Sequence, residues 1–190
     1  MNKQIIITIS ILVSAFTLYA ADVVVYPRTT GTPYPTPVPK TGQTNSYVAE
    51  DDGDLQKGIT WPATRFTVQA NTNCVIDNLT GLMWARNANQ FGTTNWGAAV
   101  TSCNNLNYGS YTDWRLPNWQ ELRSLIDASK SDPALPSEHP FAGVQSGYYW
   151  SSTTSAYDTG NAWFVFLFDG YVNDVTKVRA YYVWPVRGGY

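Results

Sequence analysis

The chain has 190 residues, a formal net charge of −2, and a charged fraction of 14% beside an aromatic fraction of 15%. This length suits one ordinary domain, and an acidic chain without a run of Lys or Arg excludes nucleic acid as its expected partner. So many large rings must be buried or stacked, which favours a loop-rich β structure over a helical bundle.

Residues 1–20 are typical of a secretory signal peptide. Lys3 supplies the positive start, the apolar stretch 5–18 is too short for a comfortable membrane span, and Ala20 ends a small-residue cleavage site. Ala21 follows where a lipoprotein would have Cys. We therefore expect an exported protein with no membrane span after cleavage, located in the periplasm, at the cell surface or outside the cell.

Residues 21–40 predict a linker. Proline stands at positions 27, 33, 35, 37 and 39, interleaved with Thr. Such spacing forbids helix and ladder pairing and favours extended polyproline II. A spacer is the first interpretation, and a Pro-rich ligand for a partner module is the alternative. The domain itself is expected over residues 41–190.

Three short strands are predicted early in this domain, over residues 65–69, 74–77 and 82–86. Asp77 and Gly81 bound a turn between the second and the third strand.

Two helices should follow, each with a recognisable start. The first has Thr94 or Asn95 as N-cap, and the second has Asn118 as N-cap with Glu121 at N3, a variant of the capping box. Their apolar stripes are Trp96, Ala99, Val100, Cys103 and Leu106 in the first, and Trp119, Leu122, Leu125 and Ile126 in the second.

The chain contains two cysteines, Cys74 and Cys103. In an exported protein an even pair most simply forms one disulfide, and loop-closure entropy would then stabilise the fold by roughly 3–4 kcal/mol. Because the first helix points Cys103 inward, we expect it to meet the strand that carries Cys74.

The C-terminal part reads as a β-hairpin. A continuous apolar run covers residues 161–168, Asp169 and Gly170 provide a turn that tolerates positive φ, and a second strand begins at Tyr171. A continuous run, unlike an alternating one, indicates a strand covered on both faces.

This hairpin, the segment 114–122 (WRLPNWQEL) and the segment 148–154 (YYWSSTT) together resemble the bacterial Lcl C-terminal domain family. The resemblance runs from Thr41 to Gly189. It implies an α+β fold of the C-type-lectin-like kind, with two helices packed on a mostly antiparallel, aromatic-rich sheet, related in fold to the formylglycine-generating enzymes. Trp184 departs from the polar or basic residue that the family would place there, which argues against an anionic ligand.

No enzymatic activity is expected. His139, the single histidine, lies in a Pro-flanked loop without a neighbouring nucleophile, so a catalytic triad has no basis. The segments 115–117 and 187–189 are similar to the formylglycine-generating relatives, but their chemistry requires a cysteine pair near the C-terminus and no Cys follows Cys103. The sequence therefore predicts no catalytic residue.

Neither a cofactor nor a metal is expected. The acidic residues 50–54, and the set Asp169, Asn173 and Asp174, offer oxygen atoms that calcium prefers. Neither set has the spacing of an EF-hand loop, so solvated turns are the first interpretation and calcium the alternative.

The expected activity is binding at the C-terminal hairpin. Sugars bind to aromatic faces, with amide, carboxylate and guanidinium groups meeting their hydroxyls. The candidate ligand-binding residues are Tyr171, Asn173, Asp174, Lys177, Arg179 and Tyr181. Lys177 and Arg179, two apart on a predicted strand, would share one face. We expect an adhesin-like module that binds a glycan; the alternative is a structural subunit of an envelope or surface assembly whose aromatic residues meet a protein.

Overall fold

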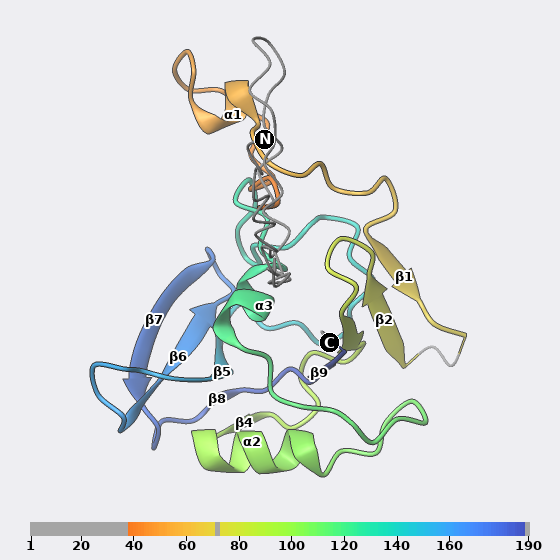
Figure 1. Cartoon of the computed structure of the whole chain (residues 1–190), viewed down its shortest axis with the longest axis vertical. Helices are drawn as coiled ribbons and strands as arrows, with labels where there is room; N and C mark the ends of the chain where they lie inside the picture. Colours follow the sequence, from red (N-terminus) through yellow and green to blue (C-terminus); the bar gives the residue numbers. More distant parts are fainter. Residues whose placement is uncertain (1–37, 71–72, 189–190) are drawn as a thin grey trace, which may run out of the picture. The chain divides into compact units, whose positions relative to one another are not determined.

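The computed structural model describes residues 38–70 and 73–188 of the chain (Figure 1). These residues form two β-sheets and three short helices. The predicted signal peptide and residues 21–37 of the predicted linker lie outside the described residues. Residues 38–40 of that linker are described: Lys40 N–H donates to Ile59 O at 3.1 Å, and Ile59 N–H donates to Val38 O at 2.9 Å. These three residues are therefore paired with the domain.

The first sheet is four-stranded and antiparallel, in the order β1-β2-β3-β9. Its strands are β1 (Phe66–Val68), β2 (Cys74–Asp77), β3 (Met83–Ala85) and β9 (Val186–Arg187). The three strands predicted near the start of the domain are confirmed. Strand β9 was not predicted, because two residues carry no recognisable alternation.

The second sheet is five-stranded, in the order β4-β8-β5-β6-β7. Its strands are β4 (Thr93–Thr94), β5 (Tyr148–Thr154), β6 (Asn161–Phe166), β7 (Tyr171–Thr176) and β8 (Tyr181–Tyr182). The predicted hairpin is confirmed as β6 and β7. Gly170 closes its turn at φ +82° and donates its N–H to Phe166 O at 2.8 Å. A Cβ at Gly170 would also come within 2.7 Å of Ile126, so glycine is required there for two reasons.

The helices are α1 (Asp52–Leu55), α2 (Trp96–Asn104) and α3 (Trp119–Arg123). Both predicted N-caps are confirmed: Asn95 accepts the N–H of Ala98, and Asn118 forms a full capping box with Glu121. Helix α3 ends before Leu125, so its predicted apolar stripe runs into the following turn. Helix α1 was not predicted, because a helix of four residues is too short to show an apolar periodicity.

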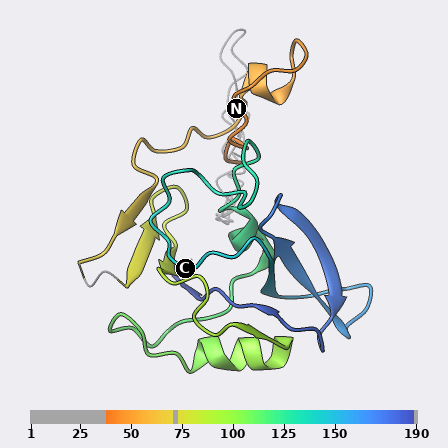
Figure 2. The ribbon, with the colours of Figure 1, turned by 180° about the vertical axis from the view of Figure 1, so that it is seen from behind.

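The fold is thus mostly β, with two sheets where the sequence predicted one. Figure 1 shows the first sheet and the second sheet on either side of α3, and Figure 2 shows the same arrangement from behind. Helices α2 and α3 both contact the second sheet, so two helices do pack on an aromatic-rich sheet as predicted. The larger buried core is shared by both sheets, because it contains Trp84 of β3 together with Tyr149 of β5 and Val165 of β6.

The guanidinium group of Arg115 joins α3 to the segment that follows β9. Arg115 donates to both carboxylate oxygens of Glu121, at 2.6 and 2.7 Å, and to Gly188 O at 2.9 Å. Arg187 donates in the same bidentate way to Asp113, at 2.7 and 2.9 Å. Both arginines therefore hold separate segments together, because paired donors fix orientation as well as position.

The predicted disulfide between Cys74 and Cys103 is wrong. Both side chains are fully buried, but Cys74 belongs to the core around Trp84 and Trp184, whereas Cys103 belongs to the core around Trp150. The expectation that Cys103 points inward was right; α2 directs it towards the second sheet and away from β2. Burial raises the pKa of the Cys103 thiol to about 12, so this thiol stays protonated near neutral pH.

Candidate binding surface

One face of the second sheet carries a row of aromatic side chains. We call it the aromatic face; it consists of Tyr148, Phe164, Phe166, Phe168, Tyr171 and Tyr181. Register brings these rings together, since Phe166 pairs with Tyr148 on β5 and with Tyr171 on β7. Directly opposite residues of antiparallel strands point to the same side of a sheet.

Four of these rings form a continuous stack. The ring of Tyr148 lies 4.3 Å from that of Phe166 and 4.9 Å from that of Tyr181, with interplanar angles of 21° and 25°. Phe168 extends the stack beyond Phe166 at 5.7 Å. The stacked rings are still partly open to solvent: Tyr148 is 40% exposed and Phe168 is 42% exposed. The inner rings therefore present mainly their edges to solvent.

Tyr171 stands beside this stack and is the most exposed ring of the face, at 51%. Its ring meets Phe164 edge-on at 6.3 Å, and its hydroxyl accepts a hydrogen bond from Asn173 Nδ2 at 2.5 Å. Asn173 is held in turn, since its Oδ1 accepts the N–H of Asp174 at 2.9 Å. Because its oxygen is an acceptor here, the Tyr171 hydroxyl keeps its own hydrogen for a further partner.

A positive charge lies at the border of the aromatic face. Burial raises the pKa of Tyr181, as does its neighbour Tyr148, while the guanidinium of Arg179 lowers it. Tyr181 therefore stays neutral at physiological pH. The exposed Arg179 side chain makes no hydrogen bond or ion pair within residues 38–70 and 73–188, so its donors remain available to a ligand.

Lys177 does not share a face with Arg179, contrary to the prediction. Strand β7 ends at Thr176, and the chain turns immediately, with Arg179 N–H donating to Thr176 O at 3.1 Å. The Lys177 ammonium donates to Thr154 Oγ1 and to Thr159 O, both at 2.9 Å, and lies 4.1 Å from the centre of the Trp96 ring. Lys177 thus connects the start of α2 to the β5–β6 connection.

Asp174 also lies away from the aromatic face. It pairs with Trp163 on the opposite side of the sheet, where its carboxylate accepts a hydrogen bond from Asn161 Nδ2 at 3.1 Å. Of the six predicted ligand-binding residues, the structure gathers Tyr171, Asn173, Tyr181 and Arg179. Sequence reasoning missed Tyr148, Phe166 and Phe168, because a continuous apolar run does not indicate which of its side chains lie on the exposed side of the sheet.

The predicted oxygen-rich turns use their carboxylates internally. Asp51 caps α1 by accepting the N–H of Asp54 and also accepts the N–H of Tyr47. Asp169 accepts the N–H of Tyr171 at 2.9 Å within the hairpin turn. Over the part of the chain that the structure describes, no group of three or more acidic, His or Cys side chains is arranged to hold a metal ion.

His139 sits in a loop as predicted and is half buried beside Phe141, with ring centres 5.9 Å apart. Burial lowers the pKa of His139, so the imidazole is neutral at physiological pH.

The model of the Lcl C-terminal domain family matches residues 73–187. The match covers the chain from β2 to β9 and includes α2, α3 and the whole second sheet. No match to the chain was found among curated proteins. None of the helices in the described residues is long and apolar enough to cross a membrane.

Proposed function

The chain belongs to the Lcl C-terminal domain family, and we propose that it is a non-catalytic, exported binding module that holds a glycan at its aromatic face. The observation that carries the proposal is the exposure of Tyr148, Phe168 and Tyr171 on one face of a sheet. A contiguous aromatic surface is costly to leave in water, and such surfaces on soluble proteins mark interaction sites.

The chemical groups on and beside the aromatic face support a sugar as ligand. The exposed rings of Phe168 and Tyr171 offer apolar surface to the C–H groups of a pyranose. The Tyr171 hydroxyl, fixed by Asn173, has a hydrogen to donate, and Arg179 offers charged donors. A sugar needs both kinds of contact, since its hydroxyls must regain hydrogen bonds lost from water.

We also infer a C-type-lectin-like fold for the domain. The support is the closure of the chain on itself, because β9 near the C-terminus pairs with β3 in the first sheet. Export follows from residues 1–20, whose pattern is that of a signal peptide.

A structural or interaction subunit is the second candidate, and one observation favours it. The rings of Tyr148 and Phe166 are stacked on each other at 4.3 Å, so each covers a face that a sugar would use. A row of ring edges suits the flatter, larger surface of a protein partner, since aromatic residues are enriched in interface cores.

Glycan-array binding of the exported protein separates the two candidates. We expect saturable binding to one structural group of glycans, reversed by the free oligosaccharide of that group. Absence of any saturable sugar signal, together with a partner protein recovered by cross-linking through the aromatic face, would contradict the glycan proposal and favour the interaction subunit.

A further inference from the structure

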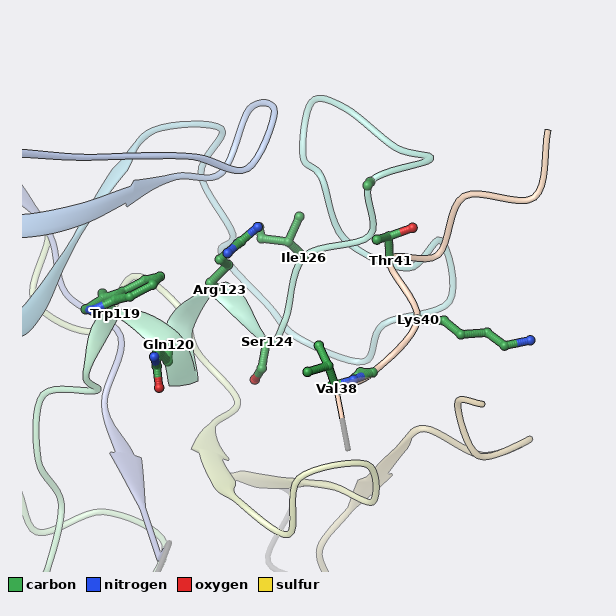
Figure 3. Close-up of a pocket in the computed structure, with 10 residues that line it drawn as sticks. Val38, Lys40, Thr41, Trp119, Gln120, Arg123, Ser124 and Ile126 are labelled. Carbon is green, nitrogen blue, oxygen red and sulfur yellow. The ribbon is translucent and has the colours of Figure 1, made fainter. Parts of the chain in front are cut away.

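A cavity of about 460 Å³ lies between residues 38–41 and the α3 region, on surface that the predicted ligand residues do not reach. Figure 3 shows its lining side chains, with Trp119, Gln120 and Arg123 on α3 and with Val38 and Thr41 on the N-terminal segment. Its volume is within the range of roughly 300–1,000 Å³ that is typical of small-molecule sites.

Both walls of the cavity are held by hydrogen bonds, so the space is formed before any ligand arrives. On one side, Thr41 O accepts the N–H of Ala128 at 2.8 Å, and Lys40 O accepts the indole N–H of Trp61 at 2.9 Å. On the other side, the capping box of Asn118 fixes the start of α3. A preformed site avoids the entropy cost of ordering its walls on binding.

The apolar part of the lining includes Trp119, Ile126 and Val38. The Trp119 ring is supported from behind by Trp163, with ring centres 6.0 Å apart and planes tilted by 31°. A supported indole offers a rigid, flat surface, and rings bind such surfaces by stacking. The shape of the apolar part therefore favours a ligand with a flat, ring-shaped body.

The charged lining residues are Lys40 and Arg123, and no Asp or Glu lines the cavity. Figure 3 shows the Lys40 side chain directed away from the cavity, while the Arg123 guanidinium extends beside Ile126. The Arg123 side chain is exposed, and its guanidinium makes no hydrogen bond or ion pair with any described residue. The side-chain amide of Gln120 likewise makes no hydrogen bond within the described residues.

The nearest carboxylates are already engaged. Glu121 forms its bidentate pair with Arg115, and Asp127 is buried while it accepts both the N–H and the hydroxyl of Ser129, at 2.9 and 2.7 Å. Arg123 therefore brings an unneutralised charge to the cavity, in a chain whose net charge is −2. A guanidinium beside apolar walls binds carboxylates strongly and in a defined orientation.

We propose that this cavity binds a small aromatic carboxylate, with its ring against Trp119 and its carboxylate on Arg123. Gln120 would donate the second polar contact through its amide. The site is separate from the aromatic face and independent of the glycan proposal, because it uses other elements and another ligand class.

Calorimetric titration of the exported protein with 2-naphthoate tests the proposal, with 2-naphthamide as a neutral probe of the same shape. We expect saturable binding of the acid and roughly tenfold or greater weakening for the amide, since one charge-assisted contact is lost. Arg123→Gln should weaken the acid by a similar factor and leave the amide unchanged. Lys57→Gln removes an exposed cation elsewhere and should change neither affinity.

Failure to bind 2-naphthoate, equal affinity for acid and amide, or an unchanged affinity in Arg123→Gln would each overturn the proposal. Location is checked by the NMR signals of the Trp119 indole N–H and the Ile126 methyl groups, which should shift on titration. Shifts centred on Tyr171 would place the ligand on the aromatic face and equally overturn it.

Discussion

Buried and exposed aromatic residues have opposite uses in this protein. In the first core Trp84 and Trp184 are fully buried, with rings 5.6 Å apart in an edge-to-face contact, and the Trp184 indole N–H donates to Ala85 O at 2.8 Å. On the second sheet, Tyr148 and Tyr171 remain 40% and 51% exposed. Rings of the first kind stabilise the fold, whereas rings of the second kind are available for recognition. Aromatic richness alone therefore does not identify a binding site; exposure within one face does.

Trp184→Ala gives the largest expected effect and tests the stabilising side of this comparison. The change empties a fully buried site and removes contacts with Trp84 and Phe141, so we expect a loss of about 3–5 kcal/mol in the free energy of unfolding. Urea denaturation followed by circular dichroism measures it. A loss below about 1 kcal/mol would mean that this core is not the stabilising one.

Glu121→Ala should have a smaller but clear effect, because one carboxylate both closes the capping box and holds Arg115. We expect a loss of about 1–2 kcal/mol in unfolding free energy. Glu121→Gln keeps the capping contact without the charge and should lose less, which separates the two roles. Equal losses in both variants would show that the ion pair alone matters.

Tyr148→Ala tests the recognition side. The ring is partly exposed and stacks on Phe166 and Tyr181, so its removal should cost about 1 kcal/mol of unfolding free energy, far less than the loss of a buried tryptophan. The same urea titration measures it. If the cost approached that of Trp184→Ala, the aromatic face would be structural and the comparison between buried and exposed rings would fail.

The smallest expected effect concerns acid stability. The hydrogen-bonded guanidinium of Arg187 is the main reason that the pKa of Asp113 lies below its ordinary value of 3.8. A carboxyl whose folded-state pKa is lowered adds stability at pH values above 3.8, and this stability is lost as pH falls through the lower, folded-state pKa. The Asp113 side chain is 42% exposed, so screening limits the contribution to roughly 0.5 kcal/mol.

Asp113→Asn should accordingly be slightly less stable than the unchanged protein at pH 6, and the difference should shrink as the pH falls below 3.8 through the lower, folded-state pKa. Unfolding free energies measured at pH 6 and at a series of lower pH values provide the check. A difference that grew on acidification would have the wrong sign for this pair.

Local features of the fold were predictable from the sequence, whereas long-range ones were not. The N-caps Asn95 and Asn118 and the turn at Gly170 were identified correctly because each depends on residues within four positions. The pairing of β9 with β3 depends on residues about a hundred positions apart. Helix α1 was not predicted from the sequence, because the helix that Asp51 caps has no apolar stripe.

The same distinction explains the errors at the candidate site and at the cysteines. That Tyr171 and Tyr181 belong to one surface could be predicted from composition, but the contribution of Tyr148 follows from its register with Phe166. Cys103 was correctly expected to be buried, yet no local signal says which of two cores a helix covers. Lys177 does not lie beside Arg179 on a strand as predicted, because β7 ends one position before it.

The most direct test of the central claim is the affinity of Tyr171→Ala for the glycan selected on the array, measured beside Tyr157→Ala. Tyr157 is 99% exposed in the β5–β6 connection and lies outside the aromatic face, which makes it a matched control. We expect Tyr171→Ala to bind roughly tenfold or more weakly with its unfolding free energy nearly unchanged, and Tyr157→Ala to bind normally. Unchanged glycan affinity in a folded Tyr171→Ala protein would contradict the claim that the aromatic face is the recognition surface.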